Sequence, residues 1–349
     1  MKKPVLSQRM TVALDAARAA AAAYVVVYHL TLEYHLQYGV GMIFGLGQEA
    51  VIVFFLLSGF VIFANERDRL TPPGGYYRRR FLRIYPPLIV AMLLSTIIYL
   101  DDGIFLESFK WRDLIGTLLM VQDISSIKPG VIVDPYLVNG PLWSLSYEMP
   151  FYLVFPFAAR ALLRWPNATP HAIGLLCVLS YAVYMLAPNH WTLVAAYFLI
   201  WWIGAMCAQA YLEGKTAVRG LMLGAVYLLG LCALTAFDVW RIGYKGLGVY
   251  PFLAFRHFVA AELLLLAALL GWRWVVIDVP VRIQAFITFL ASISYGLYIF
   301  HYPIMVEWRR VTSSPMGLVV ASILLVAISW LGDRQLSAWL RRRRSYRME

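Results

Sequence analysis

The sequence predicts an all-α integral membrane protein of about ten transmembrane helices, with both termini in the cytoplasm. Of its 349 residues, 61% are hydrophobic and 14% are charged, and the mean hydropathy is +0.69. A soluble domain is about half apolar and roughly a quarter charged. Apolar runs of about 20 residues, enough to span a bilayer, recur along the chain. Basic residues gather in alternate connections between them, which is typical of cytoplasmic loops.

Ten apolar segments are expected to form these helices. They lie at 11–36, 47–64, 84–100, 142–163, 172–187, 192–212, 219–236, 256–272, 284–304 and 316–335. The stretch 112–122 is apolar but too short to span, which indicates a re-entrant or interfacial piece. Because no hydrophilic stretch is long enough for a soluble domain, residues 1–349 are expected to form a single transmembrane domain. Arg9 and Asp15 interrupt the first apolar run, so we expect it to be retained rather than cleaved as a signal peptide.

The distribution of charge predicts the orientation. Basic residues occupy the N-terminal tail, the connection 65–83, the connections after the fourth, sixth and eighth segments, and the C-terminal stretch Arg341–Arg344. With ten helices all of these fall on the cytoplasmic side, and the acidic connection 101–141 falls outside. The net charge of +11 therefore indicates topology in a bacterial inner membrane rather than nucleic-acid binding. The three cysteines lie in apolar runs without metal-ligand spacing, so no metal site is expected.

The first segment carries two ionisable residues, Arg18 and His29. Ionisable groups are costly in hydrocarbon, so they are functional candidates there. Their separation turns about 20° beyond three full helical turns and rises about 16 Å, which places them on one face. His29 is expected near mid-depth, and histidine suits a general base because it titrates near neutrality. The alternative is that Arg18 reaches the interface and His29 only hydrogen-bonds a neighbouring helix.

An arginine cluster stands at the expected cytoplasmic mouth of the third helix. Arg79, Arg80 and Arg83 belong to it, and the last two share a helical face. Guanidinium groups fit phosphates well, so a phosphorylated cytosolic donor such as coenzyme A would suit this position. The alternative is a topology signal alone.

Two further segments carry polar residues that an apolar span would not need. Ser144 and Glu148 lie one turn apart where the fourth segment begins, and Glu148 is expected to polarise or orient a partner such as His29. The alternative is an ordinary helix start. Tyr298 and His301 stand three residues apart in the ninth segment, where the alternative is an interfacial aromatic belt. Glu262, in the eighth segment, needs a polar partner or a proton that the sequence does not identify.

Five separated motifs together resemble the acyltransferase-3 family of membrane acyltransferases. They are Leu14-Asp15-Ala16-Ala17-Arg18 with Tyr28-His29, Phe54 to Phe60 (FFLLSGF), Tyr77 to Pro86 (YRRRFLRIYP), Pro141 to Glu148 (PLWSLSYE) with Phe151-Tyr152, and Ile293 to Tyr298 (ISYGLY) with His301. The family's Arg/Lys-x10-His motif matches Arg18 and His29, and its Arg-x-x-Arg motif matches Arg80 and Arg83. The chain departs at Ala16-Ala17, where the family more often has Gly and Leu.

The resemblance implies an acyl-CoA co-substrate, usually acetyl-CoA, with no permanently bound cofactor, and an acceptor hydroxyl, often on a sugar. We expect His29 to be the base, Glu148 to orient it, and Arg18 to bind the donor or shape its channel. The arginine cluster would hold the donor phosphates. The residues expected to support the reaction or the acceptor are Ser144, Tyr295, Tyr298 and His301.

Several alternatives stay open at this stage. An acyl-histidine intermediate would serve as well as general-base chemistry. A transporter or flippase of a lipid-linked sugar or small anion also fits the composition, although it predicts two related halves that the sequence does not show. A non-catalytic scaffold of the cell envelope would leave Arg18 and His29 unexplained. The acceptor and the oligomeric state are not identified by the sequence.

Overall fold

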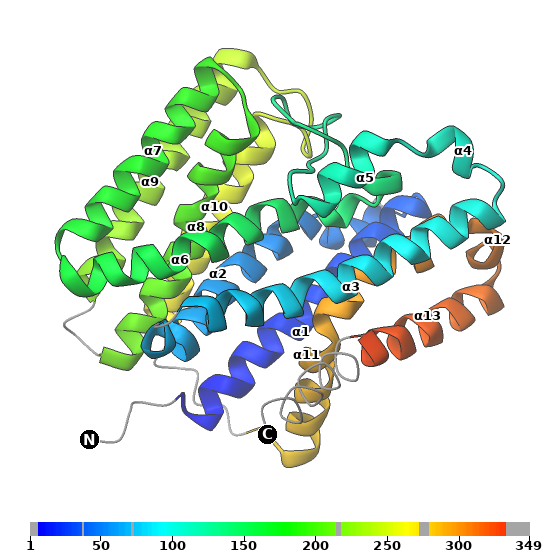
Figure 1. Cartoon of the computed structure of the whole chain (residues 1–349), viewed down its shortest axis with the longest axis horizontal. Helices are drawn as coiled ribbons and strands as arrows, with labels where there is room; N and C mark the ends of the chain where they lie inside the picture. Colours follow the sequence, from blue (N-terminus) through cyan, green and yellow to red (C-terminus); the bar gives the residue numbers. More distant parts are fainter. Residues whose placement is uncertain (1–5, 37, 71–72, 214–217, 272–278, 333–349) are drawn as a thin grey trace.

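The computed structural model describes residues 6–36, 38–70, 73–213, 218–271 and 279–332, which form a bundle of long helices (Figure 1). Each predicted apolar segment corresponds to one long helix. The helices are α1 (Gln8–Glu33), α2 (Gly47–Glu66), α3 (Pro73–Asp101), α6 (Leu145–Arg164), α7 (Ala168–Leu186), α8 (His190–Glu213), α9 (Val218–Ile242), α10 (Phe252–Gly271), α11 (Val281–His301) and α13 (Pro315–Trp330). The all-α membrane fold class is therefore confirmed.

Within the described ranges, eight helices are long and apolar enough to cross a membrane. The two others are α6, which contains Pro150 and Pro156 as well as charged residues, and α13, which has 16 residues. The count of ten spans and the orientation stay predictions. The basic residues Lys2, Lys3, Lys215, Arg273 and Arg341–Arg344, which contribute to the predicted orientation, lie outside the described residues.

Two helix boundaries differ from the prediction and change the position of the candidate residues. Helix α3 begins at Pro73 rather than at 84, so the arginine cluster lies inside the helix. Helix α1 begins at Gln8, because the Ser7 hydroxyl accepts a hydrogen bond from the Met10 amide at 3.2 Å, and it ends at Glu33. His29 therefore lies close to the end of α1, and its expected depth in the membrane stays a prediction.

The acidic connection 101–141 contains two short helices, α4 (Phe105–Ser108) and α5 (Trp111–Leu118). The apolar stretch 112–122 is thus a short helix and a turn, and the Tyr85 hydroxyl, near the middle of α3, donates to the Leu118 carbonyl of α5 at 3.0 Å. A buried ion pair fastens this connection to the start of α6. The Lys128 ammonium lies 2.8 Å from Asp123 and 3.8 Å from the centre of the Trp143 ring. Burial lowers the pKa of Lys128, and the Asp123 carboxylate opposes that shift.

Helices α2 and α8 approach closely at two glycines. A Cβ atom on Gly59 would lie 1.9 Å from the Trp201 carbonyl oxygen, and one on Gly204 would lie 2.0 Å from the Leu56 carbonyl oxygen. Small residues permit such backbone contact between membrane helices. The contact fixes the position of Ser58, the neighbour of Gly59, which belongs to the site described next.

Candidate active site

A cavity of about 550 Å³ lies between α1, α2, α3, α6 and α11. These helices are far apart in the sequence, and α1, α3 and α11 are seen together in Figure 1. Seven of the ten predicted site residues line the cavity. They are Arg18, Arg80, Arg83, Ser144, Glu148, Tyr295 and Tyr298. The other three, Arg79, His29 and His301, are not part of its wall.

The arginine cluster is organised by a carboxylate that the sequence analysis missed. Glu66, the last residue of α2, is only 4% exposed. Its carboxylate accepts hydrogen bonds from Arg80 at 3.1 Å and from the Arg79 Nε at 3.0 Å. Arg80 also lies over the Tyr76 and Tyr152 rings. The available signal was an acidic residue at the end of an apolar segment, directly before an arginine-rich connection.

Arg83 points to a different neighbour. Its guanidinium lies over the Tyr295 ring, 5.4 Å from the ring centre, so α3 and α11 meet at this point of the cavity wall. A cation over an aromatic face is a favourable contact that fixes the direction of a long side chain. Arg80 and Arg83 thereby face one cavity, as their shared helical face predicted.

Glu148 belongs to a hydrogen-bonded chain that crosses the cavity wall. The Tyr152 hydroxyl donates to the Glu148 carboxylate at 2.5 Å and lies 3.1 Å from the Ser58 hydroxyl. The Trp201 indole donates to Ser58 at 3.1 Å. The expectation that Glu148 orients His29 is therefore wrong, because Glu148 is held by Tyr152 and the neighbour of His29 is another histidine.

His29 and His301 form a pair, with His29 Nδ1 and His301 Nε2 3.0 Å apart. His301 Nδ1 lies 2.8 Å from the Tyr298 carbonyl oxygen, and a carbonyl can only accept. We therefore assign the His301 proton to Nδ1, which leaves Nε2 to accept from His29 Nδ1–H. The carbonyl of Val25, 3.0 Å from His29 Nδ1, requires the same tautomer. The basic lone pair of His29 is consequently on Nε2.

Tyr298 connects the cavity to the histidine pair. It lines the cavity, and its ring centre lies 6.3 Å from that of His301, one turn further along α11. The Tyr298 hydroxyl donates to the Pro141 carbonyl at 2.7 Å and lies 2.9 Å from the Ser144 hydroxyl. Three separate sequence motifs thus meet at one end of the cavity.

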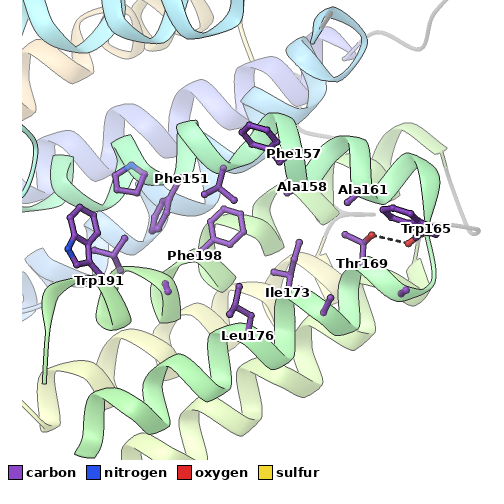
Figure 2. A pocket seen from close by; sticks show the side chains of 16 residues that line it. Phe151, Phe157, Ala158, Ala161, Trp165, Thr169, Ile173, Leu176, Trp191 and Phe198 are labelled. Carbon is purple, nitrogen blue, oxygen red and sulfur yellow. Dashed lines mark hydrogen bonds between the residues drawn. The ribbon is translucent and has the colours of Figure 1, made fainter. Parts of the chain in front are cut away.

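A second cavity, of about 600 Å³, has a different character. It lies between α6, α7 and α8, and its walls are apolar side chains such as Phe151, Phe198 and Leu176 (Figure 2). The hydroxyl of Thr169 in its wall donates to the Trp165 carbonyl at 2.9 Å. Its lining residues include no titratable group, so it offers no acid–base chemistry. Glu262 lies in neither lining set, and its buried Oε2 has no hydrogen-bond partner within the described residues.

The fold and the site together define a helical membrane protein with a cationic cavity, one wall residue of which, Tyr298, lies next to a partly buried histidine pair. The chain belongs to the acyltransferase-3 family, whose sequence model, an acyltransferase domain, matches residues 11–334. The resemblance seen in the motifs is thereby confirmed. No solved structure matches the chain significantly.

Three kinds of relatives indicate the range of the similarity. The acyltransferase MdmB of Streptomyces mycarofaciens is 37% identical over 141 residues, which cover 38% of this chain and 35% of MdmB. Nodulation protein 10 of Rhizobium leguminosarum is 24% identical over 80% of this chain and 79% of its own length. The O-acetyltransferase OatA of Staphylococcus aureus is 29% identical over 45% of this chain and 26% of OatA. The chain thus matches about a third of MdmB and about a quarter of OatA.

Proposed function

We propose that this chain moves an acyl group, with acetyl as the default, from cytosolic acyl-CoA to a hydroxyl of a glycan or related acceptor. The observation that carries the proposal is the single cavity that joins Arg18, Arg80 and Arg83 to Tyr298, next to the His29–His301 pair. The family and the names of two relatives, an acyltransferase and an O-acetyltransferase, support it. We place the protein in a bacterial inner membrane, with the basic connections in the cytoplasm.

In this proposal the donor occupies the cavity. Arg80 and Arg83 bind the phosphates of the acyl-CoA, and Arg18 contributes a third positive charge to the same wall. Arg79 acts indirectly, because it shares the Glu66 carboxylate with Arg80 and stays outside the lining. The pantetheine arm extends towards Tyr298, which brings the thioester close to the histidine pair.

The chemistry is general-base catalysis by His29. Its Nε2 takes the proton of the acceptor hydroxyl as that oxygen attacks the thioester carbonyl carbon. The C–S bond then breaks, the imidazolium returns its proton to the sulfur, and free CoA and an ester are the products. His301 fixes the tautomer of His29 and shares the positive charge while it exists. General-base assistance contributes about 10²–10⁴-fold to the rate.

An acyl-histidine intermediate is the alternative route on the same residues. In it His29 Nε2 attacks the thioester first, and the acceptor hydroxyl then attacks the acylated imidazole. Brief mixing with radiolabelled acetyl-CoA and denaturation at neutral pH distinguishes the two routes, since label on the protein that disappears in His29→Ala would establish the intermediate.

Binding and hydrolysis of acetyl-CoA by the purified protein in detergent test the function. We expect wild type to bind and slowly release CoA, Arg83→Ala to weaken binding about 10–100-fold, and His29→Ala to bind normally but lose turnover. Arg160→Ala is the matched control, because Arg160 donates to the Leu70 carbonyl at 2.8 Å and does not line the cavity. If wild type consumes neither acetyl-CoA nor longer or acidic acyl-CoAs, a transporter becomes the better hypothesis.

A further inference from the structure

A polar cluster lies beyond the histidine pair, on the side away from the cavity. The Tyr302 ring meets His29 edge-on, with ring centres 5.4 Å apart. Tyr302 begins a π-helical turn, Tyr302–Glu307, that continues α11 past His301. Ser95 belongs to α3 and lies about 18 Å further along that helix than Arg83. The other two members are Glu307, at the end of the π-helical turn, and Asn139, two residues before the Pro141 carbonyl that accepts from Tyr298.

The hydrogen bonds in this cluster run in one direction. The Asn139 amide Nδ2 donates to the Ser95 hydroxyl at 3.5 Å, and that hydroxyl donates to Glu307 Oε2 at 3.3 Å. The amide nitrogen can only donate, so the Ser95 hydroxyl accepts from it and keeps its own proton for the Glu307 carboxyl group. The two atoms left over are Asn139 Oδ1, which is an acceptor, and Oε1, the second oxygen of the Glu307 carboxyl group, with which the Tyr99 hydroxyl also interacts.

These two oxygens are buried and have no hydrogen-bond partner of ordinary geometry within the described part of the chain. Asn139 is fully buried. Buried acceptors in a folded protein are normally satisfied, so an unpaired couple beside a reactive histidine needs an explanation. The donor chemistry proposed above does not use them.

We propose that Asn139 and Glu307 form the acceptor subsite, and that its ligand is a polyhydroxylated carbohydrate. This inference rests on the proposed acyl transfer. Two neighbouring hydroxyls of a sugar would donate to Asn139 Oδ1 and Glu307 Oε1, and the hydroxyl to be acylated would donate to His29 Nε2. The Tyr302 ring offers an apolar surface to the sugar face beside that hydroxyl. The donor and the acceptor then reach His29 from opposite sides.

The outer ends of α1 and α3 are linked directly above this cluster. Helix α12 (Arg309–Thr312) follows Glu307, and its arginines pair with Glu33 of α1 at 2.9 Å and with Asp102, directly after α3, at 3.1 Å. Arg309 and Arg310 are largely exposed. Ion pairs at an exposed surface contribute little stability, so they oppose the entry of a sugar only weakly.

The test compares acetyl-CoA hydrolysis with acyl transfer to carbohydrate in the variants Glu307→Gln and Asn139→Leu. The purified proteins are assayed for acetyl-CoA hydrolysis, in which water is the acceptor. The same variants, expressed in the source strain without the chromosomal copy, are assayed for base-labile acetate in the carbohydrate fraction of the envelope. Glu262→Gln is the matched control, because it neutralises another buried carboxyl with an unpaired oxygen, on α10.

We expect Glu307→Gln and Asn139→Leu to lower carbohydrate acetylation at least about tenfold while acetyl-CoA hydrolysis stays within about twofold of wild type. His29→Ala should lose both, and Glu262→Gln neither. Equal loss of both activities in Glu307→Gln, or no loss of either, would overturn the subsite. If wild type hydrolyses acetyl-CoA but the His29-dependent acetate appears only in lipid or small-molecule fractions, the carbohydrate assignment fails while the proposed transfer stands. Absence of any hydrolysis by wild type would refute the transfer itself.

Discussion

His301 takes a position beside His29 that a carboxylate occupies in many hydrolytic sites. A carboxylate would also accept from His29 Nδ1–H, but a second charge is expensive in an apolar interior. A neutral imidazole held by two backbone carbonyls accepts the same hydrogen bond without a charge. The pair therefore fixes the tautomer of the proposed base, His29, without placing a carboxylate charge in an apolar interior.

Substitution of His301 tests this positioning role. We expect His301→Ala to lower kcat for CoA release about 10–100-fold, because His29 would lose its tautomer preference, with KM for acetyl-CoA within about twofold of wild type. His301→Asn should restore part of kcat, since its side-chain oxygen also accepts from His29. Steady-state kinetics at several acetyl-CoA concentrations give kcat and KM separately. An effect confined to KM, or equal loss in both variants, would exclude the role.

At the scale of elements, the contact between α2 and α8 holds the cavity wall that Ser58 belongs to. Both obstacles to a larger residue are backbone atoms, which cannot rotate away. We expect Gly204→Ala to lower the thermal unfolding midpoint by several degrees, at a cost of about 1–3 kcal/mol. Gly230→Ala, where the nearest atom would be 3.8 Å away, is the control and should be neutral or stabilising. Unfolding in detergent, followed by tryptophan fluorescence, makes the comparison. Equal midpoints for both variants would contradict it.

The buried Lys128–Asp123 pair tests how the connection 101–141 is fastened to the rest of the protein. Tyr147 of α6 also donates to Asp123, at 2.6 Å, so removal of Lys128 leaves a buried carboxylate with one partner fewer. We expect Lys128→Met to destabilise the protein by about 3–5 kcal/mol, and the double variant with Asp123→Asn to regain a large part of it. Denaturant unfolding of wild type, Lys128→Met, Asp123→Asn and the double variant gives the coupling free energy between the two residues. Additive losses would show that the pair does not act as a unit.

At the scale of the whole molecule, the function needs the arginine cluster to face the cytoplasm. After replacement of Cys177, Cys207 and Cys232, single cysteines report the side of the membrane. Leu106 is 88% exposed. We therefore expect a membrane-impermeant maleimide to label Leu106→Cys in intact cells. Arg69→Cys, also exposed, should react about tenfold more after permeabilisation. The reverse pattern would place the donor cavity outside and exclude a cytosolic donor.

The class of the protein and most of the residues that line its cavity could be predicted from the sequence alone. Apolar runs of spanning length and ionisable residues within them are readable without a structure, because hydrocarbon makes both conspicuous. Arg18 and Glu148 were selected in this way, Arg80 and Arg83 as a basic cluster beside an apolar run, and Tyr298 by its spacing from His301. The structure brings all five to one cavity.

Which side chains contact one another could be seen only in the folded structure. The pairing of His29 with His301, the Glu66 carboxylate beside Arg80, and the chain from Asn139 through Ser95 to Glu307 each join residues from different helices or connections. A sequence pattern fixes which face of one helix is polar, but not which neighbour that face meets. That depends on how the helices cross, which here is set by close contacts such as Gly59 and Gly204.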